Sequence, residues 1–197
     1  MKKPLFKMLL LGLTVGGMFF TSCKQEPKPE DSKEVAEEQN EAKFDDTNEA
    51  KEDDSDYLVA AAEKDLEEIE TGKLAASKGT DPEIKKFGQM MVDDHTKAST
   101  TTKSLAQRKN ITLPMALTEK GKEHYDDLND EKSGKDFDKK YADMMVDGHE
   151  DAISKMKDAS EKASDPEIRA WAGNMVPTLE AHLGHAKALQ EKINNKK

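Results

Sequence analysis

The 197-residue chain has little of several residue types, and each shortage excludes a class of protein. A single cysteine, Cys23, excludes an internal disulfide framework and a cysteine-rich metal site. Aromatic residues make up 5% of the chain and hydrophobic residues 35%, against 37% charged residues, which is typical of long helices around a thin core. The formal charge of −10 argues against nucleic acid as a partner. The sequence also has no nucleophile elbow and no glycine-rich phosphate loop, so no catalytic residue is predicted.

The first residues predict where in the cell the protein is located. Lysines at 2, 3 and 7 precede an apolar run over residues 9–20, which is too short for a comfortable transmembrane helix. This pattern predicts a secretory signal peptide over residues 1–22. The stretch Phe20-Thr21-Ser22-Cys23 resembles a bacterial lipobox, which implies that Cys23 becomes the lipidated first residue. An ordinary signal peptide with a chance cysteine is the alternative. The lipobox reading places the protein in the cell envelope, anchored to a membrane that we expect to be the outer one.

The next segment is strongly acidic. Residues 24–55 carry 13 acidic side chains and 5 basic ones. Such a segment cannot bury enough apolar surface to offset the entropy lost on ordering. We therefore expect residues 23–55 to form a disordered acidic tether between the membrane and a folded domain at residues 56–197.

A repeated tetrapeptide organises that domain. The sequence Asp81-Pro82-Glu83-Ile84 recurs as Asp165-Pro166-Glu167-Ile168, 84 positions later, and Tyr57 and Tyr141 are related by the same offset. Asp at an N-cap and Pro at the first helical position are typical of a helix start. The repeat predicts an all-α fold, a four-helix bundle built from two copies of a helical hairpin.

Apolar residues at helical spacing predict the four helices at about 56–77, 82–109, 136–163 and from 166 onwards. A long connection at 115–134 contains a short helix. The first helix carries an apolar stripe at Leu58, Ala62, Leu66 and Ile69. Pro177 lies inside the fourth helix, and we expect it to kink or break that helix.

Three histidines fall on the apolar stripes of three different helices, namely His95, His149 and His182. The remaining helix offers Glu68, with Asp65 one turn earlier. One inward ligand per helix is how helical bundles build metal sites, and imidazole with carboxylate suits Fe, Zn, Mn or Cu. Asp65, Asp94 and Glu180 could orient the rings from outside the ligand set. The alternative is a buried hydrogen-bond network that specifies the packing of the helices.

Two further features leave alternatives open. Met91 and Met145 each stand four residues before a histidine, and a thioether beside an imidazole favours copper or haem iron. Methionine is also an ordinary filler of hydrophobic cores, and this is the simpler interpretation. His124 and His185 lie outside the pattern, so we expect both at the surface.

Residues 56–190 resemble a bacterial family, the domain of unknown function 4142. The matching pieces are spread along the domain in order, namely Glu68 with Gly72-Lys73-Leu74-Ala75, Phe87 to Ala98, Phe137-Asp138 with Tyr141, His149-Glu150, and Pro177 to His182. The resemblance implies a ferritin-like four-helix fold and an envelope location, and no established activity. Ferritin-like proteins bind two metals through Glu-x-x-His pairs. Here Val92 and Leu179 stand in place of those glutamates, which argues against a di-iron centre and leaves a mononuclear site open.

The sequence thus supports two functional hypotheses. The first is a non-enzymatic, lipid-anchored envelope protein with a structural, interaction or stress-related role. The alternative is a bundle that binds a transition metal through Glu68, His95, His149 and His182. Convergence of the three imidazoles within a few ångströms would favour the alternative.

Overall fold

The computed structural model describes residues 30–44 and 49–195, and its described residues form helices and no strands, which confirms the all-α prediction. The helices are α1 (Ser32–Phe44), α2 (Glu49–Lys78), α3 (Pro82–Lys109), α4 (Glu119–Asp130), α5 (Lys135–Lys162) and α6 (Pro166–Asn195). The predicted signal peptide and Cys23 lie outside the described residues. No described helix combines the length and apolar character needed to cross a membrane.

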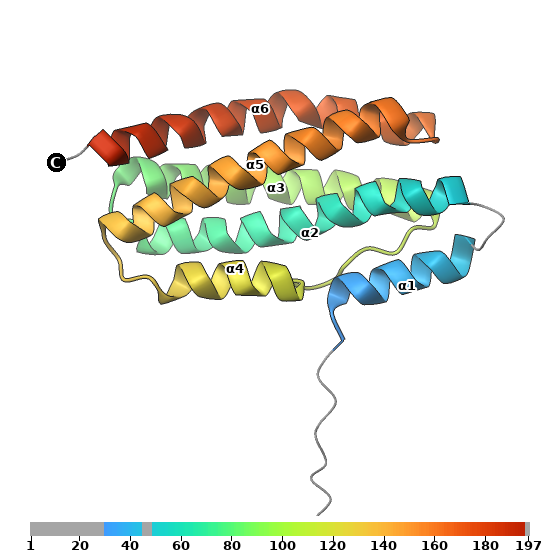
Figure 1. Ribbon diagram of the computed structural model, residues 1–197, viewed down its shortest axis with the longest axis horizontal. Helices are drawn as coiled ribbons and strands as arrows, with labels where there is room; N and C mark the ends of the chain where they lie inside the picture. Colours follow the sequence, from blue (N-terminus) through green and yellow to red (C-terminus); the bar gives the residue numbers. More distant parts are fainter. Residues whose placement is uncertain (1–29, 45–48, 196–197) are drawn as a thin grey trace, which may run out of the picture.

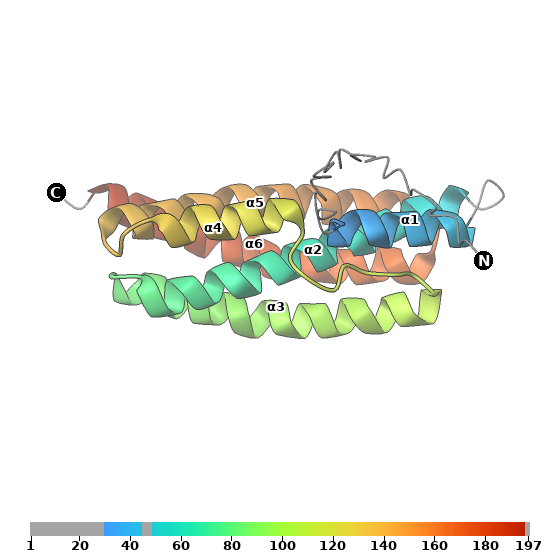
Figure 2. The same cartoon turned by 90° about the horizontal axis from the view of Figure 1, so that it is seen from below.

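Four long helices lie along a common direction (Figure 1). α2 packs against α3 over most of its length, and α5 packs in the same way against α6, so each pair forms a hairpin. α1 and α4 both pack along α2. Figure 2 shows these two shorter helices on the same side of the molecule, with α3 on the opposite side.

The repeated Asp-Pro-Glu sequence starts α3 and α6, as predicted. Asp81 Oδ1 accepts the backbone N–H of Glu83 at 2.8 Å, and Asp165 Oδ1 accepts that of Glu167 at 2.7 Å. Side-chain acceptance of these free N–H groups is what stabilises a helix start. At the other end of α3, Asn110 adopts a left-handed conformation with φ 60°, which ends the helix.

Each of these turns is also held by an aspartate from the opposite hairpin. The Asp138 carboxylate at the start of α5 accepts the backbone N–H groups of Thr80 and Asp81, at 2.9 and 2.8 Å. The Asp54 carboxylate in α2 accepts those of Ser164 and Asp165, each at 2.7 Å. Asp54 and Asp138 are 84 positions apart, so the repeat extends to these contacts between hairpins.

The core consists of two hydrophobic clusters separated along the helix axes. One includes Leu58, Leu105, Met156, Trp171 and Leu179. The other includes Ile84, Phe87, Met91, Tyr141, Met145 and Ile193. On every long helix, the stretch between its contributions to the two clusters is where the candidate site residues fall.

The prediction of a disordered tether over residues 23–55 is wrong for the described part of that segment. Residues 32–44 form α1, and α2 begins at Glu49 rather than near residue 56. α1 buries Ala36, Asn40 and Phe44, which recur every four residues on one face. The Asn40 side chain also exchanges two hydrogen bonds with the backbone of Thr112, at 2.9 and 2.7 Å. Contacts distant in sequence therefore order a segment whose own composition favours disorder.

Two expectations about individual helices also need correction. α6 continues through Pro177, so the expectation of a break is wrong, while that of a kink stays a prediction. Proline removes one bond to the carbonyl four residues earlier, and that residue, Gly173, is exposed, so water can replace the bond. On α2, Leu66 and Ile69 are only half-buried, whereas Asp65, Glu68 and Gly72 are buried. Leu58 and Ala62 are buried as expected, so the stripe holds in the first half of α2. In the second half, the side that faces the core carries polar and small residues.

This choice of face follows from the close approach of α2 and α3. A Cβ atom built on Gly72 would lie 2.8 Å from the backbone oxygen of Gly88, and one on Gly88 would lie 2.7 Å from that of Gly72. The two backbones therefore touch where neither residue has a side chain. This contact fixes α2 with Asp65 and Glu68 towards the interior.

Candidate metal centre

Glu68, His95, His149 and His182 meet in the middle of the molecule, one from each long helix. Their exposed fractions are 0%, 3%, 0% and 3%, so water does not reach them freely. The two hydrophobic clusters lie on either side of them along the helix axes. Charged and polar groups interact more strongly in such surroundings than in water, so each contact within this group has a large effect on the energy of the site.

The ligand-type atoms of the four side chains converge. One nitrogen of each histidine lies within 4.8 Å of a nitrogen of the other two. Glu68 Oε2 lies 2.7 Å from His95 Nε2 and 3.4 Å from His149 Nε2. His149 Nε2 in turn lies 3.3 Å from His182 Nδ1. The imidazoles therefore converge within a few ångströms, an arrangement compatible with a metal site.

The second nitrogen of each ring is held by an acceptor outside this group. His95 Nδ1 lies 2.9 Å from Asp65 Oδ1, and His149 Nδ1 lies 2.8 Å from the backbone oxygen of Met145. His182 Nε2 lies 3.2 Å from Asp94 Oδ2. A nitrogen facing an oxygen acceptor carries the proton in a neutral imidazole, so the other nitrogen presents a lone pair to the centre. Such outer acceptors commonly fix the tautomer of histidines that bind metals.

Several atoms at the centre have no hydrogen-bond partner among the described residues. They are both carboxylate oxygens of Glu68, His95 Nε2 and Asp65 Oδ2, together with the hydroxyl of Tyr141. The short contact between Glu68 and His95 is thus not aligned as a hydrogen bond, although the two atoms are close. Buried polar atoms without partners are costly, and each one in a folded protein calls for an explanation.

The electrostatics of the group are set by burial and by two carboxylates. Burial alone would lower the pKa of His95, but Glu68 and Asp65 raise it to about 10. Burial lowers the pKa of His182 to about 4, helped by the neighbouring rings, and it lowers the pKa of His149 as well. Burial alone would raise the pKa of Glu68, but His95 and His149 hold it well below its usual range. In the absence of other cations, the group thus contains one protonated ring, two neutral rings and an ionised Glu68.

Glycine at position 148 leaves room for a further charged residue. A Cβ atom there would lie 3.2 Å from Lys64 Nζ and 3.4 Å from Glu68 Oε1. Lys64 also pairs with Glu67 at 3.2 Å. Sequence reasoning did not assign Lys64, Gly148 or Tyr141 to the site, although Tyr141 was noted in the repeat and in the family resemblance. The position of Gly148 directly before His149 was a signal for the first two.

The other residues singled out from the sequence fall in different places. Asp65 and Asp94 orient His95 and His182, in keeping with the role expected of them. Glu180 was expected in the same role, but its carboxylate is exposed and pairs with Lys157 at 2.8 Å. His124 and His185 lie away from the centre. The side chain of His124 is 40% exposed and contacts Glu67, while His185 is exposed and packs against Phe87.

Met91 and Met145 are both fully buried in the same hydrophobic cluster. The backbone oxygen of Met145 holds the ring of His149. The contacts of these two methionines therefore agree with their simpler interpretation as core residues.

Fold and site together define an all-α domain with a buried cluster of three histidines and a glutamate. The profile of the family described as "Domain of unknown function (DUF4142)" matches residues 39–189, and the chain belongs to that family. This match confirms the resemblance seen in the sequence. No curated protein and no solved structure matches the chain.

Proposed function

We propose that this protein binds one divalent transition-metal ion through His95, His149, His182 and Glu68. The observation that carries the proposal is the spacing of the donor atoms. In a tetrahedral site with bonds of about 2.1 Å, neighbouring ligand atoms lie about 3.4 Å apart. The His149–His182 and Glu68–His149 contacts measure 3.3 and 3.4 Å. Glu68 Oε2 and His95 Nε2 lie 2.7 Å apart, so these two side chains would separate slightly when the ion binds.

The alternative of a hydrogen-bond network meets a specific difficulty at His149 and His182. Each ring has its outer nitrogen beside an oxygen, at Met145 and Asp94, so each neutral ring turns a lone pair towards the other. With a proton on each outer nitrogen, the two lone pairs would face one another at 3.3 Å with no proton between them. A cation at the centre would bind both lone pairs and would also satisfy the oxygens of Glu68.

Charge balance supports an ion of charge +2. The buried carboxylates of Asp65 and Glu68 outweigh the single proton that His95 takes up, because the other two rings are neutral and the nearby Lys64 is paired with Glu67. A divalent ion bound beside a neutral His95 would offset both carboxylates. Three imidazoles and a carboxylate suit Zn, Fe, Mn or Cu, and this ligand set is poor for Mg or Ca.

The closed ligand set favours holding a metal over turning over a substrate on it. Sites that use metal for catalysis keep a position open, whereas four protein ligands complete a tetrahedral site. We therefore combine the two hypotheses and propose a non-enzymatic metal-binding protein. We further propose a ferritin-like four-helix architecture, supported by the two packed hairpins and by the family. Its centre is mononuclear, because Val92 and Leu179 offer no carboxylate.

Thermal unfolding tests the metal proposal. The sample is the mature chain expected from the sequence, residues 23–197 with Cys23→Ser, produced without an affinity tag and stripped of metal. Adding Zn²⁺ to 100 times its dissociation constant should stabilise it by about 2.7 kcal/mol. His149→Ala should abolish the stabilisation, and His124→Ala, which removes a partly exposed histidine, should preserve it. Equal stabilisation of the two variants would show that Zn²⁺ acts elsewhere and would refute the site.

We also propose that the protein is attached to a membrane of the cell envelope through lipid on Cys23. The support is the sequence alone, from the lysines at 2, 3 and 7 to the lipobox-like Phe20-Thr21-Ser22-Cys23. Cys23→Ser should move the protein from the membrane fraction to the soluble one. If the variant stays with membranes after a high-salt wash, lipid on Cys23 is not the anchor.

A further inference from the structure

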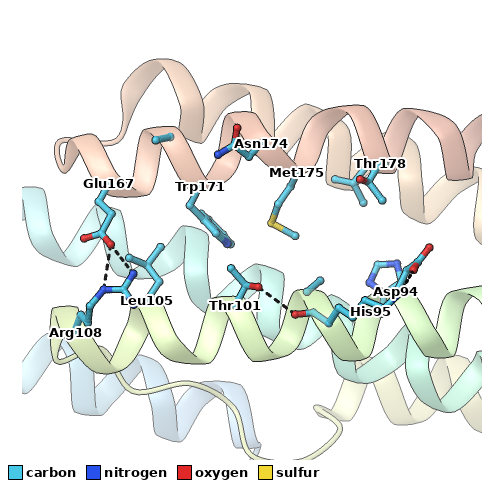
Figure 3. Close-up of a pocket in the computed structure, with 14 residues that line it drawn as sticks. Asp94, His95, Thr101, Leu105, Arg108, Glu167, Trp171, Asn174, Met175 and Thr178 are labelled. Carbon is cyan, nitrogen blue, oxygen red and sulfur yellow. Dashed lines mark hydrogen bonds and ion pairs between the residues drawn. The ribbon is translucent and has the colours of Figure 1, made fainter.

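A second site lies outside the metal centre, in a groove between α3 and α6. The groove has a volume of about 630 Å³ and runs from His95 at one end to Arg108 and Glu167 at the other. Figure 3 shows its side chains projecting from the two helices towards each other. Its volume falls within the range of small-molecule sites, about 300–1,000 Å³.

The groove lies where the backbones of α3 and α6 approach each other at fewer points than those of α2 and α5, and ion pairs such as Arg108–Glu167 bridge the two helices. Its walls are largely apolar, with Leu105, Trp171, Met175 and Leu179 among the lining residues. Leu105 and Leu179 have exposed fractions of 1% and 4%, so these residues belong to the core and present only their edges to the groove. Met175 is half-buried and presents more of its side chain, so an apolar molecule would find a preformed, mainly apolar surface there.

One donor in the wall has no partner. Trp171 is 7% exposed, and its indole N–H makes no hydrogen bond among the described residues. In Figure 3 the indole extends from α6 towards α3, with its nitrogen at the leading edge. A buried N–H without an acceptor is costly, and a ligand acceptor that displaced the side chains covering this nitrogen would remove the cost.

The charges along the groove are paired with each other. Arg108 contacts Glu167 at 2.5 Å, and Lys97 contacts Asp94 at 3.0 Å. These two pairs leave no net charge for an ionic ligand to neutralise. The groove thus favours a neutral molecule.

We propose that this groove binds a neutral, mainly apolar organic molecule whose carbonyl oxygen accepts the indole N–H of Trp171. Its apolar body lies against Leu105, Met175 and Leu179. The proposal goes beyond the metal centre and does not depend on it, although His95 forms part of both sites. Either site can be tested while the other is left intact.

The experiment uses the single tryptophan of the chain as its reporter. In ¹⁵N-labelled protein, residues 23–197 with Cys23→Ser, the indole N–H gives one resolved signal. The probe is 2-acetylnaphthalene, and its matched control is 2-ethylnaphthalene, which has the same shape and no acceptor. We expect the ketone to bind saturably and to move the indole proton downfield. The hydrocarbon should bind about five-fold more weakly, the loss of one neutral hydrogen bond, without the downfield shift.

Variants separate the groove from the surface. Thr101 lines the groove and its neighbour Thr100 does not, yet both are exposed threonines of α3. Thr101→Phe should block both probes, and Thr100→Phe should block neither. Trp171→Phe should bring the affinity for the ketone down to that for the hydrocarbon.

Three results would overturn the proposal. The first is the absence of saturable binding by either probe to wild-type protein. The second is equal affinity for ketone and hydrocarbon that Trp171→Phe leaves unchanged. The third is tighter binding of 2-naphthoate than of the ketone, which would show that the groove selects an anion.

Discussion

Single residues decide which side of α2 faces the interior. Gly72 and Gly88 let two backbones touch, and the same face of α2 then directs Asp65 and Glu68 to the centre. The polar site therefore depends on the absence of two side chains. An apolar stripe with larger side chains, such as Leu66 and Ile69, could not approach α3 so closely.

Substitution of these glycines should destabilise the fold. A Cβ atom at position 88 would lie 2.7 Å from the Gly72 oxygen and 2.8 Å from the Ala75 Cβ, and backbone cannot move aside cheaply. Gly88→Ala should lower the free energy of unfolding by about 1–3 kcal/mol, measured by urea denaturation. Gly184 lies within α6 with no atom within 4 Å of a built Cβ, so Gly184→Ala should raise that free energy by up to about 1 kcal/mol. The same change of stability in both variants would contradict the packing account.

Helical geometry explains which site residues the sequence could predict. His95, His149 and His182 were singled out because they lie on the apolar stripes of their helices, and Glu68 because it is the carboxylate that the remaining helix offers. The prediction that Glu180 orients a histidine ring was wrong. Glu180 stands two residues before His182, about 200° around the helix, so its side chain points outwards. Asp94 stands one residue before His95, about 100° away, and reaches His182 on the neighbouring helix instead. Sequence proximity to a histidine is thus a poor guide to which ring a carboxylate orients.

Elements are joined to one another by carboxylates at the helix starts. The bounds of α3 agree with the sequence because Asp81-Pro82 and Asn110 are strong local signals for its two ends. The contacts of Asp54 and Asp138 were missed, although their spacing of 84 residues was visible. Their partners lie in the other hairpin, and a local signal cannot show that.

Loss of one such contact between the hairpins should lower the free energy of unfolding. Asp138→Ala leaves the backbone N–H groups of Thr80 and Asp81 without their acceptor, so the free energy of unfolding should fall by about 1–3 kcal/mol. Asp136→Ala removes an exposed carboxylate of the same first turn and should cost at most about 1 kcal/mol. Both values come from chemical denaturation monitored by circular dichroism. Equal losses would mean that Asp138 acts only through the helix dipole.

The packing of α1 should likewise depend on one polar side chain. Asn40→Ala removes both hydrogen bonds to Thr112 and should lower the free energy of unfolding by about 1–3 kcal/mol. Glu41→Ala changes the exposed neighbouring residue and should have an effect within about 0.5 kcal/mol. If Asn40→Ala has no larger effect than its neighbour, residues 32–44 behave as the tether that the composition predicted.

The four long helices form two hairpins whose turns repeat at an offset of 84 residues, and the residues at the centre do not repeat at that offset. The offset of 84 that relates the turns places Asp65 opposite His149 and Glu68 opposite Ala152. The repeat therefore predicted the hairpins and could not predict the site. The heights at which the four side chains meet depend on how the hairpins slide and rotate against each other, and only the three-dimensional structure gives that.

The distribution of polarity at this scale explains why the centre calls for a cation. Two hydrophobic clusters enclose the carboxylates of Asp65 and Glu68 with the single protonated ring of His95, and several atoms of this group have no hydrogen-bond partner among the described residues. Replacing a buried charged group with a neutral one is expected to lower the free energy of unfolding strongly, unless the remaining buried charges balance. A cation bound at the centre would balance these buried charges with the fewest changes to the fold.

Elemental analysis of the mature chain, residues 23–197 with Cys23→Ser, purified without an affinity tag and dialysed, tests the central claim most directly. We predict about one equivalent of Zn, Fe, Mn or Cu in wild-type protein. His182→Ala should lose it, while His185→Ala, three residues along the same helix and exposed, should keep it. Metal-free wild-type protein that takes up no ion on addition of Zn²⁺, Fe²⁺, Mn²⁺ or Cu²⁺ would contradict the claim. The histidines would then be part of a buried polar network.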